Sequence, residues 1–554
     1  MDLDVLFINP PFRLIPPFQY KLIDPPRNLA LLAATIREKG HSAAIIDMPI
    51  LEMGFDEIVD KIESNPPKII AISNRSTYSF PIVCKLATII KKAFPHTPII
   101  VGGTYVSFAP QEALKSEENI DIVVIGEGEI TLSNLVKKII SRKDFSKTKG
   151  IAYRDDAGNI VRNEDSEPIK DLSIIPLPAL DLLPIEKYVE RKERYILDTT
   201  RGCLYGCDYC TSSYTKFSIR YRPIEQVMDE IKLAYNLGFE NFYFFDDLFT
   251  ANKKLAVGIC KEIVKNKIKI KWPCMTRLNL VNDEVLGWMK KAGCDLVAYG
   301  VESTSERYLK DIGKLHQLKK TEEIFELTKQ HGIRPLAFVI FGLPKTTFKD
   351  EMETIKFINK IGADAVGAFS FKPYPGTIYY SHPSDHGIRI IDNNFSRWSQ
   401  LDEPTHETKH LTKDEIVESM LVCNYLFRSG GTFANGIKYR RKKNVVLIRT
   451  EQGGVIYNPN LEASKRKTDM YLSCKKLDSE YYEVLLRCDG YHNKDDICNI
   501  FIKLFHKTLE DAEQKIKEII SLSLEIGLVE EIPDVMEYVN VEEQKALAYG
   551  GGLV

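Results

Sequence analysis

Three cysteines stand close together near the middle of the chain, at Cys203, Cys207 and Cys210, with the spacing C-x3-C-x2-C. Thiolate is the usual protein ligand of the iron in iron–sulfur clusters, so three thiolates on one tight loop can hold three corners of a cubic 4Fe–4S cluster. The fourth iron then has no protein ligand and can bind a substrate. A structural zinc site would need a fourth Cys or His at a short spacing, and none follows in the sequence. The spacing therefore predicts a cluster with one open iron; the alternative is three structural cysteines in an ordinary loop.

This cysteine motif resembles the signature of the radical S-adenosylmethionine (SAM) superfamily. The resemblance implies that the open iron chelates the amino and carboxylate groups of SAM. One electron from the reduced cluster would then cleave SAM into methionine and a radical that takes hydrogen from an unactivated carbon. A protein that donates this electron, such as flavodoxin or ferredoxin, is implied as a partner.

Composition limits the class of protein. With 554 residues the chain is too long for a single core, and 44% hydrophobic with 27% charged residues is ordinary for a globular protein. A formal net charge of −2 gives no global basic field, so we expect no nucleic acid partner. No apolar run is long enough to span a bilayer, and the sequence opens on acids where a signal peptide carries basic residues. A cytoplasmic protein without a membrane contact is expected.

The elements that must position this chemistry begin with an open α/β sheet over residues 1–140. Apolar runs at 4–9, 42–47, 69–72 and 99–101 alternate with helical segments, which predicts parallel strands joined by right-handed crossovers. Ligands of such sheets lie beyond the carboxyl ends of the strands. Two of the expected ends, Gly102-Gly103-Thr104 and Gly126-Glu127-Gly128-Glu129, carry glycines, which let a flat ligand approach the backbone closely.

The order of these pieces resembles the Rossmann-like cobalamin-binding domain that precedes many radical SAM modules. The pieces that match are an Asn-Pro-Pro turn, Gly40-His41 leading to Asp47, a Gly-Gly turn and a Gly-Glu-Gly-Glu stretch. The resemblance implies that cobalamin, as methylcobalamin during turnover, contacts Asn9, Pro10, Ser73, Arg75, Thr77, Gly102, Gly103, Thr104, Tyr105, Gly126 and Glu127.

Two features of this first domain depart from the resemblance. The chain has no Asp-x-His-x-x-Gly segment, and Thr104-Tyr105 stands where relatives often have Pro-His, so cobalt is expected to lack a histidine lower ligand. Arg75 is then assigned a catalytic role beneath cobalt, where a cation opposes a fifth ligand. The alternative is that Arg75 pairs with a phosphate, a propionamide oxygen or a nearby acid.

A second α/β unit follows a predicted linker at 141–190. Between 191 and 395, six strand-like runs alternate with amphipathic helices, which predicts a partial (β/α)6 barrel with its chemistry at the carboxyl ends of the strands. The strand runs are 195–200, 241–245, 272–276, 296–300, 336–341 and 365–371.

This succession again resembles the cobalamin-dependent radical SAM enzymes. The resemblance implies that Tyr209 flanks the adenine of SAM, as a catalytic and cofactor-binding residue. It also implies SAM contacts from Asp246, Arg277, Glu302 and Ser303. Arg277 and Glu302 equally suit structural ion pairs.

The last part of the chain has a different pattern. A helical linker is predicted at 396–444, then a small α+β winged-helix domain at 445–535, then a tail at 536–554. A hairpin and helices at 479–488, 494–505 and 509–526 resemble the recognition element of peptide-modifying enzymes, which captures a leader peptide as an added strand. A structural or dimerising role is the alternative.

Together these expectations describe a cobalamin-dependent radical SAM C-methyltransferase that modifies a ribosomally synthesised precursor peptide. A cobalamin-assisted epimerase or cyclase uses the same cofactors and stays open. An enzyme of a free small molecule and a non-catalytic redox sensor are further alternatives.

Overall fold

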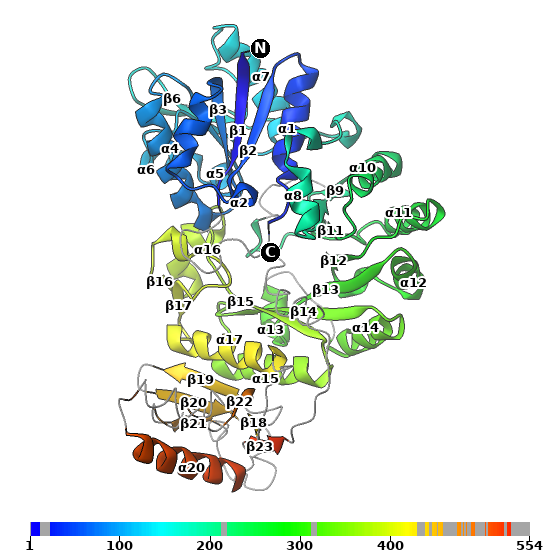
Figure 1. The fold of residues 1–554 in the computed structure, drawn as a ribbon, viewed down its shortest axis with the longest axis vertical. Coiled ribbons are helices and arrows are strands. Elements are labelled where there is room, and N and C mark those ends of the chain that lie inside the picture. Colours follow the sequence, from blue (N-terminus) through cyan, green and yellow to red (C-terminus); the bar gives the residue numbers. More distant parts are fainter. Residues whose placement is uncertain are drawn as a thin grey trace.

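The computed structural model describes most of the first 428 residues and shorter segments beyond them. Figure 1 shows three parts arranged along the long axis: the N-terminal sheet with its helices, the second sheet, and a small C-terminal part. None of the helices among the described residues is long and apolar enough to cross a membrane. The described residues are 2–11, 23–211, 219–311, 318–428, 438–441, 446–450, 453–457, 474–477, 480, 484, 489–493, 505, 508–525 and 529–532.

The first domain is a seven-stranded sheet with the order β2-β1-β3-β4-β5-β6-β7. Its first five strands are parallel and almost wholly buried, because helices cover both faces. One face packs on α1 (Arg27–Glu38) and α7 (Gly128–Ile140), the other on α4 (Phe80–Ala93) and α6 (Pro110–Ser116). The strands are β1 (Leu3–Asn9), β2 (Ala43–Asp47), β3 (Pro67–Asn74), β4 (Ile99–Gly103), β5 (Ile122–Val124), β6 (Ile151–Arg154) and β7 (Ile160–Arg162).

The end of this sheet differs from the prediction. Strands β6 and β7 lie inside the segment predicted as a linker at 141–190, and they join the sheet in antiparallel pairing. They form a hairpin whose turn contains Gly158 at φ +83°, a conformation that glycine adopts readily. The first sheet therefore continues past residue 140. Shorter helices in this half are α2 (Met48–Leu51), α3 (Glu57–Glu63), α5 (Thr104–Phe108) and α8 (Ile185–Glu190).

The second domain is a six-stranded parallel sheet with the order β15-β14-β13-β12-β11-β8, as predicted for a partial barrel. Its outer helices and the strands share one large apolar core. The strands are β8 (Tyr195–Leu197), β11 (Phe242–Phe244), β12 (Trp272–Thr276), β13 (Cys294–Glu302), β14 (Arg334–Phe341) and β15 (Ala365–Ser370). The helices are α10 (Ile224–Asn236), α11 (Lys253–Lys265), α12 (Asp283–Lys291), α13 (Glu306–Asp311), α14 (Leu318–Gln330) and α15 (Phe348–Lys360).

The helical linker predicted at 396–444 contains α17 (Lys413–Arg428), which packs on α15 and β15. Before it lie α16 (Ile378–Ser381) and the antiparallel pair β16 (Ile388–Ile390) and β17 (His406–Thr408).

The C-terminal part contains the predicted hairpin and the last predicted helix, α20 (Leu509–Glu525). The hairpin belongs to an antiparallel sheet of order β19-β20-β21, and a second small sheet has the order β22-β18-β23. The helices predicted at 479–488 and 494–505 fall almost entirely outside the described residues. The strands are β18 (Lys438–Arg441), β19 (Val446–Thr450), β20 (Gly453–Tyr457), β21 (Cys474–Leu477), β22 (Asp489–Asn493) and β23 (Val529–Ile532).

Candidate active site between the two parallel sheets

The cysteine motif lies on a loop at the carboxyl end of the first barrel strand. The short strand β9 (Thr200–Arg201), paired with β10 (Arg220–Tyr221), leads directly into it. Cys207 is buried, and Cys203 and Cys210 are half-buried. Among the described residues, no three His, Cys, Asp or Glu side chains converge as they would around one metal ion. A four-iron cube spreads its thiolates over separate irons, so three cysteine side chains on one loop fit the donor set of such a cluster without that convergence.

Arg277 follows β12 and faces the cysteine loop. Its guanidinium lies 3.6 Å from the ring centroid of Tyr205, whose hydroxyl accepts a hydrogen bond of 3.2 Å from Asn279. The Nη1 atom of Arg277 is buried, and no hydrogen-bond partner for it exists in the described part of the chain. Because buried donors are rarely left unpaired, this nitrogen fits a ligand carboxylate.

Asp246 follows β11 and is 1% exposed. Its Oδ1 accepts hydrogen bonds of 2.6–3.0 Å from the backbone amides and hydroxyls of Thr199 and Thr200, which precede the cysteine loop. Burial raises the pKa of Asp246 to about 7, although these hydrogen bonds lower it. Its Oδ2 is buried and accepts no hydrogen bond from any described residue. Asp246 thus fixes the start of the loop with one oxygen and has the other available to a ligand.

Glu302 ends β13 in an unusual backbone conformation. Its φ is +63°, and the pairing of β13 with β14 shifts register between Gly300 and Glu302. Bulges and left-handed non-glycine residues are costly and concentrate at functional sites, where they turn a side chain. Glu302 and Ser303 are both buried, and the charge of Glu302 helps burial to raise the pKa of Tyr209. The structure thus brings Tyr209 and Glu302 together; Tyr209 also packs on an apolar group around Phe371 and Leu343.

The facing edge of the first domain carries buried amides. Asn9 donates a 2.8 Å hydrogen bond to Asp47, which also accepts one from Tyr188 of α8. The Oδ1 atoms of Asn9 and Asn74 are buried and have no hydrogen-bond partner among the described residues. Burial raises the pKa of Asp47 to about 7, against the effects of Asn9 and Arg75. Spare buried acceptors at the ends of β1 and β3 fit the amide groups around a corrin ring.

Glycines open the neighbouring part of this edge. Gly103, at φ +128°, lies so close to β3 that an added Cβ would stand 1.9 Å from the carbonyl oxygen of Asn74. Gly126, at φ +76°, has nothing within 4 Å of such a Cβ. Thr104 is exposed beside them, so Gly103, Thr104 and Gly126 fit a flat ligand. Gly102 is half-buried, whereas Tyr105 points into the core against Phe80 and Phe395.

The remaining predicted contacts of this domain are less open. Pro10 and Thr77 are buried, and Ser73 accepts a weak 3.4 Å hydrogen bond from Asn28. Burial lowers the pKa of Arg75, while the charges of Asp24, Tyr78 and Asp47 raise it. Arg75 therefore lies among acids, as the ion-pair alternative requires, at the end of the sheet where the catalytic prediction places it.

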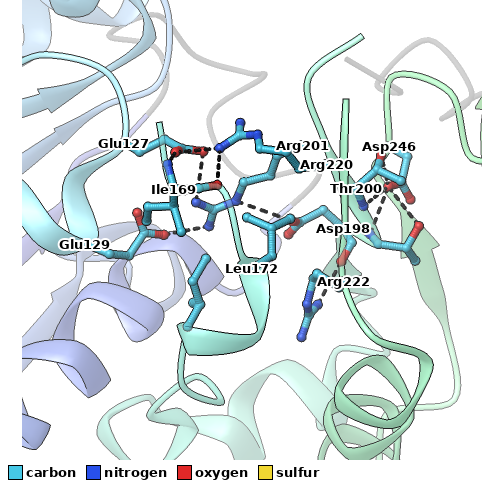
Figure 2. Close-up of polar contacts among 12 residues, drawn as sticks. Glu127, Glu129, Ile169, Leu172, Asp198, Thr200, Arg201, Arg220, Arg222 and Asp246 are labelled. Atoms are coloured by element: carbon cyan, nitrogen blue, oxygen red, sulfur yellow. Dashed lines mark hydrogen bonds and ion pairs between the residues drawn. The ribbon is translucent and has the colours of Figure 1, made fainter. Parts of the chain in front are cut away.

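Glu127 contacts the second domain, and no pattern in the sequence indicates this. Arg201, which precedes the cysteine loop, donates to Glu127 (3.3 Å) and to Glu129 (2.6 Å), and Arg220 donates to Glu127 (2.8 Å) (Figure 2). Burial opposes the effect, but hydrogen bonds from Arg220 and Ile169 and the charge of Arg201 lower the pKa of Glu127. The loop after β5 in the first domain and the short strands that flank the cysteine loop are thus joined by ion pairs.

A second group of interdomain ion pairs was also missed. Arg27 of α1 donates to both Asp198 and Glu230 of the second domain, and Arg222 donates to Glu230 over 2.6 Å. Although burial raises it, these arginines hold the pKa of Asp198 down at about 2. Both groups bring the carboxyl ends of the two sheets face to face.

Comparison with known families agrees with this two-sheet arrangement. The model of the radical SAM superfamily matches residues 197–358, and that of the B12 binding domain matches residues 19–136. An uncharacterised methyltransferase of Pyrococcus horikoshii is 32% identical over 397 residues, which are 71% of this chain and 85% of the relative. An anaerobic magnesium-protoporphyrin IX monomethyl ester cyclase of Synechocystis is 26% identical over 400 residues, 71% of this chain and 79% of the cyclase.

A solved structure shows the same fold. The cobalamin-dependent S-adenosylmethionine radical enzyme OxsB, with aqua-cobalamin bound, aligns with a TM-score of 0.65. The alignment covers 99% of this chain and 84% of OxsB at 17% sequence identity.

Proposed function

The chain belongs to the cobalamin-dependent radical SAM enzymes, and on this premise we propose that it is a C-methyltransferase that modifies a ribosomally synthesised peptide. Its cofactors are a 4Fe–4S cluster, SAM and cobalamin. When bound, the cluster with SAM supplies radical chemistry and cobalamin supplies a carrier for the methyl group, while the protein binds, orients and excludes water.

The observation that carries the proposal is the meeting of the two sheet ends. Arg201 stands two residues before Cys203 and is ion-paired with Glu127 and Glu129, which follow β5 at the open edge of the first sheet. The loop proposed to hold the cluster and the edge proposed to hold the corrin are therefore neighbours. A methyl carrier and SAM bound at these two places would share one reaction space.

The predicted site residues of the second domain then each have a role in binding the cluster or SAM. Cys203, Cys207 and Cys210 hold three irons. Arg277 offers its buried Nη1 to the carboxylate of SAM, and its stacking on Tyr205 ties that contact to the cysteine loop.

The residues around this carboxylate contact orient the rest of SAM. Asp246 fixes Thr199 and Thr200 at the start of the loop. Glu302 and Ser303 present buried polar groups, and Tyr209 screens the site from water by packing on its apolar neighbours.

The first domain provides the flat site. Gly103, Thr104 and Gly126 leave its edge low and open, and the spare amide oxygens of Asn9 and Asn74 accept hydrogen bonds from the ring substituents. Arg75 is proposed to lie beneath cobalt and to oppose a fifth ligand.

The peptide substrate is proposed from the C-terminal part. Strands β19, β20 and β21 form an antiparallel sheet in this order, so β19 and β21 are its two edge strands. Because α17 packs against β19, we propose that the peptide pairs with β21. An extended leader peptide that pairs with this edge would gain main-chain hydrogen bonds.

The test uses the full chain, reconstituted anaerobically with iron, sulfide and cobalamin, and the precursor peptide encoded beside its gene. With SAM and dithionite we expect the mass of the peptide to rise by one methyl group. Cys207→Ala should lose bound iron and all product. An unchanged peptide mass, with SAM intact, would refute the proposal.

The peptide step has its own control. A chain ending at residue 444 should still cleave SAM but modify the leader-bearing peptide far more slowly. Equal rates for the truncated and full chains would point to a free small molecule as substrate.

Cyclisation is the second candidate, because a cyclase is 26% identical over 71% of this chain. It predicts a product lighter by two hydrogens rather than heavier by a methyl group.

A further inference from the structure

A pocket of about 860 Å³ lies on the outer side of α7, and Glu127 is the one lining residue that is also a predicted cobalamin contact. Six lysines line it, and we call it the lysine pocket. Two carboxylates also line it, Glu127 and Glu167, and arginines already engage Glu127. The six are Lys137, Lys138, Lys143, Lys147, Lys149 and Lys170.

Most of these lysines form no ion pair with a described residue. Lys149 pairs with Glu164 at 2.7 Å. The other exposed lysines of the lysine pocket have no carboxylate within ion-pair distance in the described part of the chain; they are Lys137, Lys143, Lys147 and Lys170. Since the whole chain carries a net charge of −2, this concentration of lysines is a local feature. Its field would attract an acidic partner and speed the encounter.

Apolar side chains stand among the lysines. Ile130 and Ile174 line the same pocket and are 47% and 58% exposed. Large apolar groups surrounded by charge are typical of protein docking surfaces, because the apolar contact supplies affinity and the charged rim supplies orientation. The two exposed isoleucines would add no affinity for a small anion, so they favour a protein as the ligand.

The inner wall of the lysine pocket connects to the cysteine loop. Glu127 and Ile169 form part of this wall, and Arg220 donates to Glu127 (2.8 Å) and to the carbonyl of Ile169 (2.7 Å) (Figure 2). Glu127 also accepts from Arg201, two residues before Cys203. A protein seated in the pocket would therefore stand against the ion pairs that hold the cysteine loop.

We propose that the lysine pocket is the docking surface for an acidic one-electron carrier protein that reduces the cluster. The inference rests on the proposed function, since that chemistry consumes an electron that a carrier must deliver. The step is balanced: the carrier loses one electron, the cluster gains it, and no bond forms or breaks. The opposite charges steer the carrier, and the isoleucines hold it long enough for transfer.

The test compares electron delivery by a protein and by a small reductant. In the reconstituted full chain, Lys137→Glu, Lys143→Glu and Lys147→Glu are combined, and cluster reduction by an acidic reduced flavodoxin is followed by anaerobic stopped flow. We expect the rate to fall at least about tenfold at low ionic strength, with reduction by dithionite within about twofold of wild type. Added salt should slow the wild type and leave the triple variant little changed.

A matched control uses Lys92→Glu with Lys115→Glu, two exposed lysines on α4 and α6 across the same sheet. Flavodoxin should reduce this variant at the wild-type rate. Wild-type kinetics for the triple variant would overturn the docking proposal. The pocket would be assigned to nucleic acid if flavodoxin reduced the triple variant at the wild-type rate while RNA bound to the wild type and to the control variant but not to the triple variant. Failure of dithionite-reduced wild type to cleave SAM would instead count against the proposed function.

Discussion

Asp47 and Asp246 are buried carboxylates at the carboxyl ends of β2 and β11, each 1% exposed. Burial raises the pKa of each to about 7. A hydrophobic residue at either position would avoid the cost of burying a charge. Each carboxylate instead fixes the neighbouring backbone or side chains at an edge proposed to hold a cofactor. The burial of these two carboxylates lowers stability at both edges, which supports the proposal that the edges hold cofactors.

Because Asp47 is buried, we expect the substitution Asp47→Asn to raise the folding stability by an amount that depends on pH. The pKa of Asp47 is near 7 in the folded protein and near 3.8 when exposed, so between these values the folded state holds more protons and stability falls as pH rises. Above pH 7 the full penalty is reached, at most about 4 kcal/mol from three pKa units. The neutral amide avoids it. Thermal melts should therefore show a larger gain for the variant at pH 8 than at pH 5. An equal difference at both pH values would show that Asp47 does not titrate in this range.

At the scale of elements, the close approach of β3 and β4 depends on glycine at position 103, which has no Cβ. In Gly103→Ala the methyl group would meet the carbonyl oxygen of Asn74 at 1.9 Å, in a backbone conformation that also disfavours alanine. Because backbone must move, we expect a loss on the order of 4 kcal/mol in urea unfolding and weaker cobalamin binding. Gly126→Ala is the control, since its Cβ would have no atom within 4 Å. Only its positive φ should then lower the free energy of unfolding, by about 1 kcal/mol. If Gly103→Ala and Gly126→Ala lost the same stability, the close contact between position 103 and Asn74 would have no energetic importance.

Apolar runs bounded by turn residues predicted most strands closely. Residues 272–276 match β12 fully, and 99–101 lie within β4, because a buried parallel strand is apolar on both faces. Strands β6 and β7 were missed because they have only four and three residues, and no residue of β7 is fully buried. For β13 the run at 296–300 stopped short of Glu302, since a register shift carries the strand through a charged residue.

Sequence signals for the candidate site are local. The spacing of Cys203, Cys207 and Cys210 is by itself enough to predict a cluster site, and this assignment stays a prediction. Glu127 was assigned to the corrin because its Gly-Glu-Gly-Glu stretch resembles cobalamin-binding domains, and no sequence pattern shows that Arg201, 74 residues away, pairs with it. Tyr105 was assigned by its position after two glycines, whereas its ring is packed against Phe80.

At the scale of the whole molecule, the two α/β domains are joined by charges. Arg27 belongs to α1 of the first domain and lies between Asp198 and Glu230 of the second; Glu230 is fully buried and is also held by Arg222. Buried ion pairs contribute little net stability compared with apolar contacts, but they demand one geometry. This interface therefore fixes the distance between the two proposed cofactor sites more than it adds to affinity between the domains.

Removal of Arg27 tests this interface. In Arg27→Met the carboxylates of Asp198 and Glu230 stay buried with one cation fewer, so we expect a loss of about 3–5 kcal/mol. Arg37→Met on the same helix is the matched control: its pair with Asp181 is exposed, and its loss should stay within about 1 kcal/mol. Urea unfolding followed by tryptophan fluorescence measures both, and cobalamin affinity reports whether the edge keeps its shape. If Arg27→Met costs no more than its control, apolar packing alone sets the domain geometry. A loss confined to Arg27→Met, with cobalamin still bound by the folded fraction, means that the charges orient the domains without shaping the corrin site.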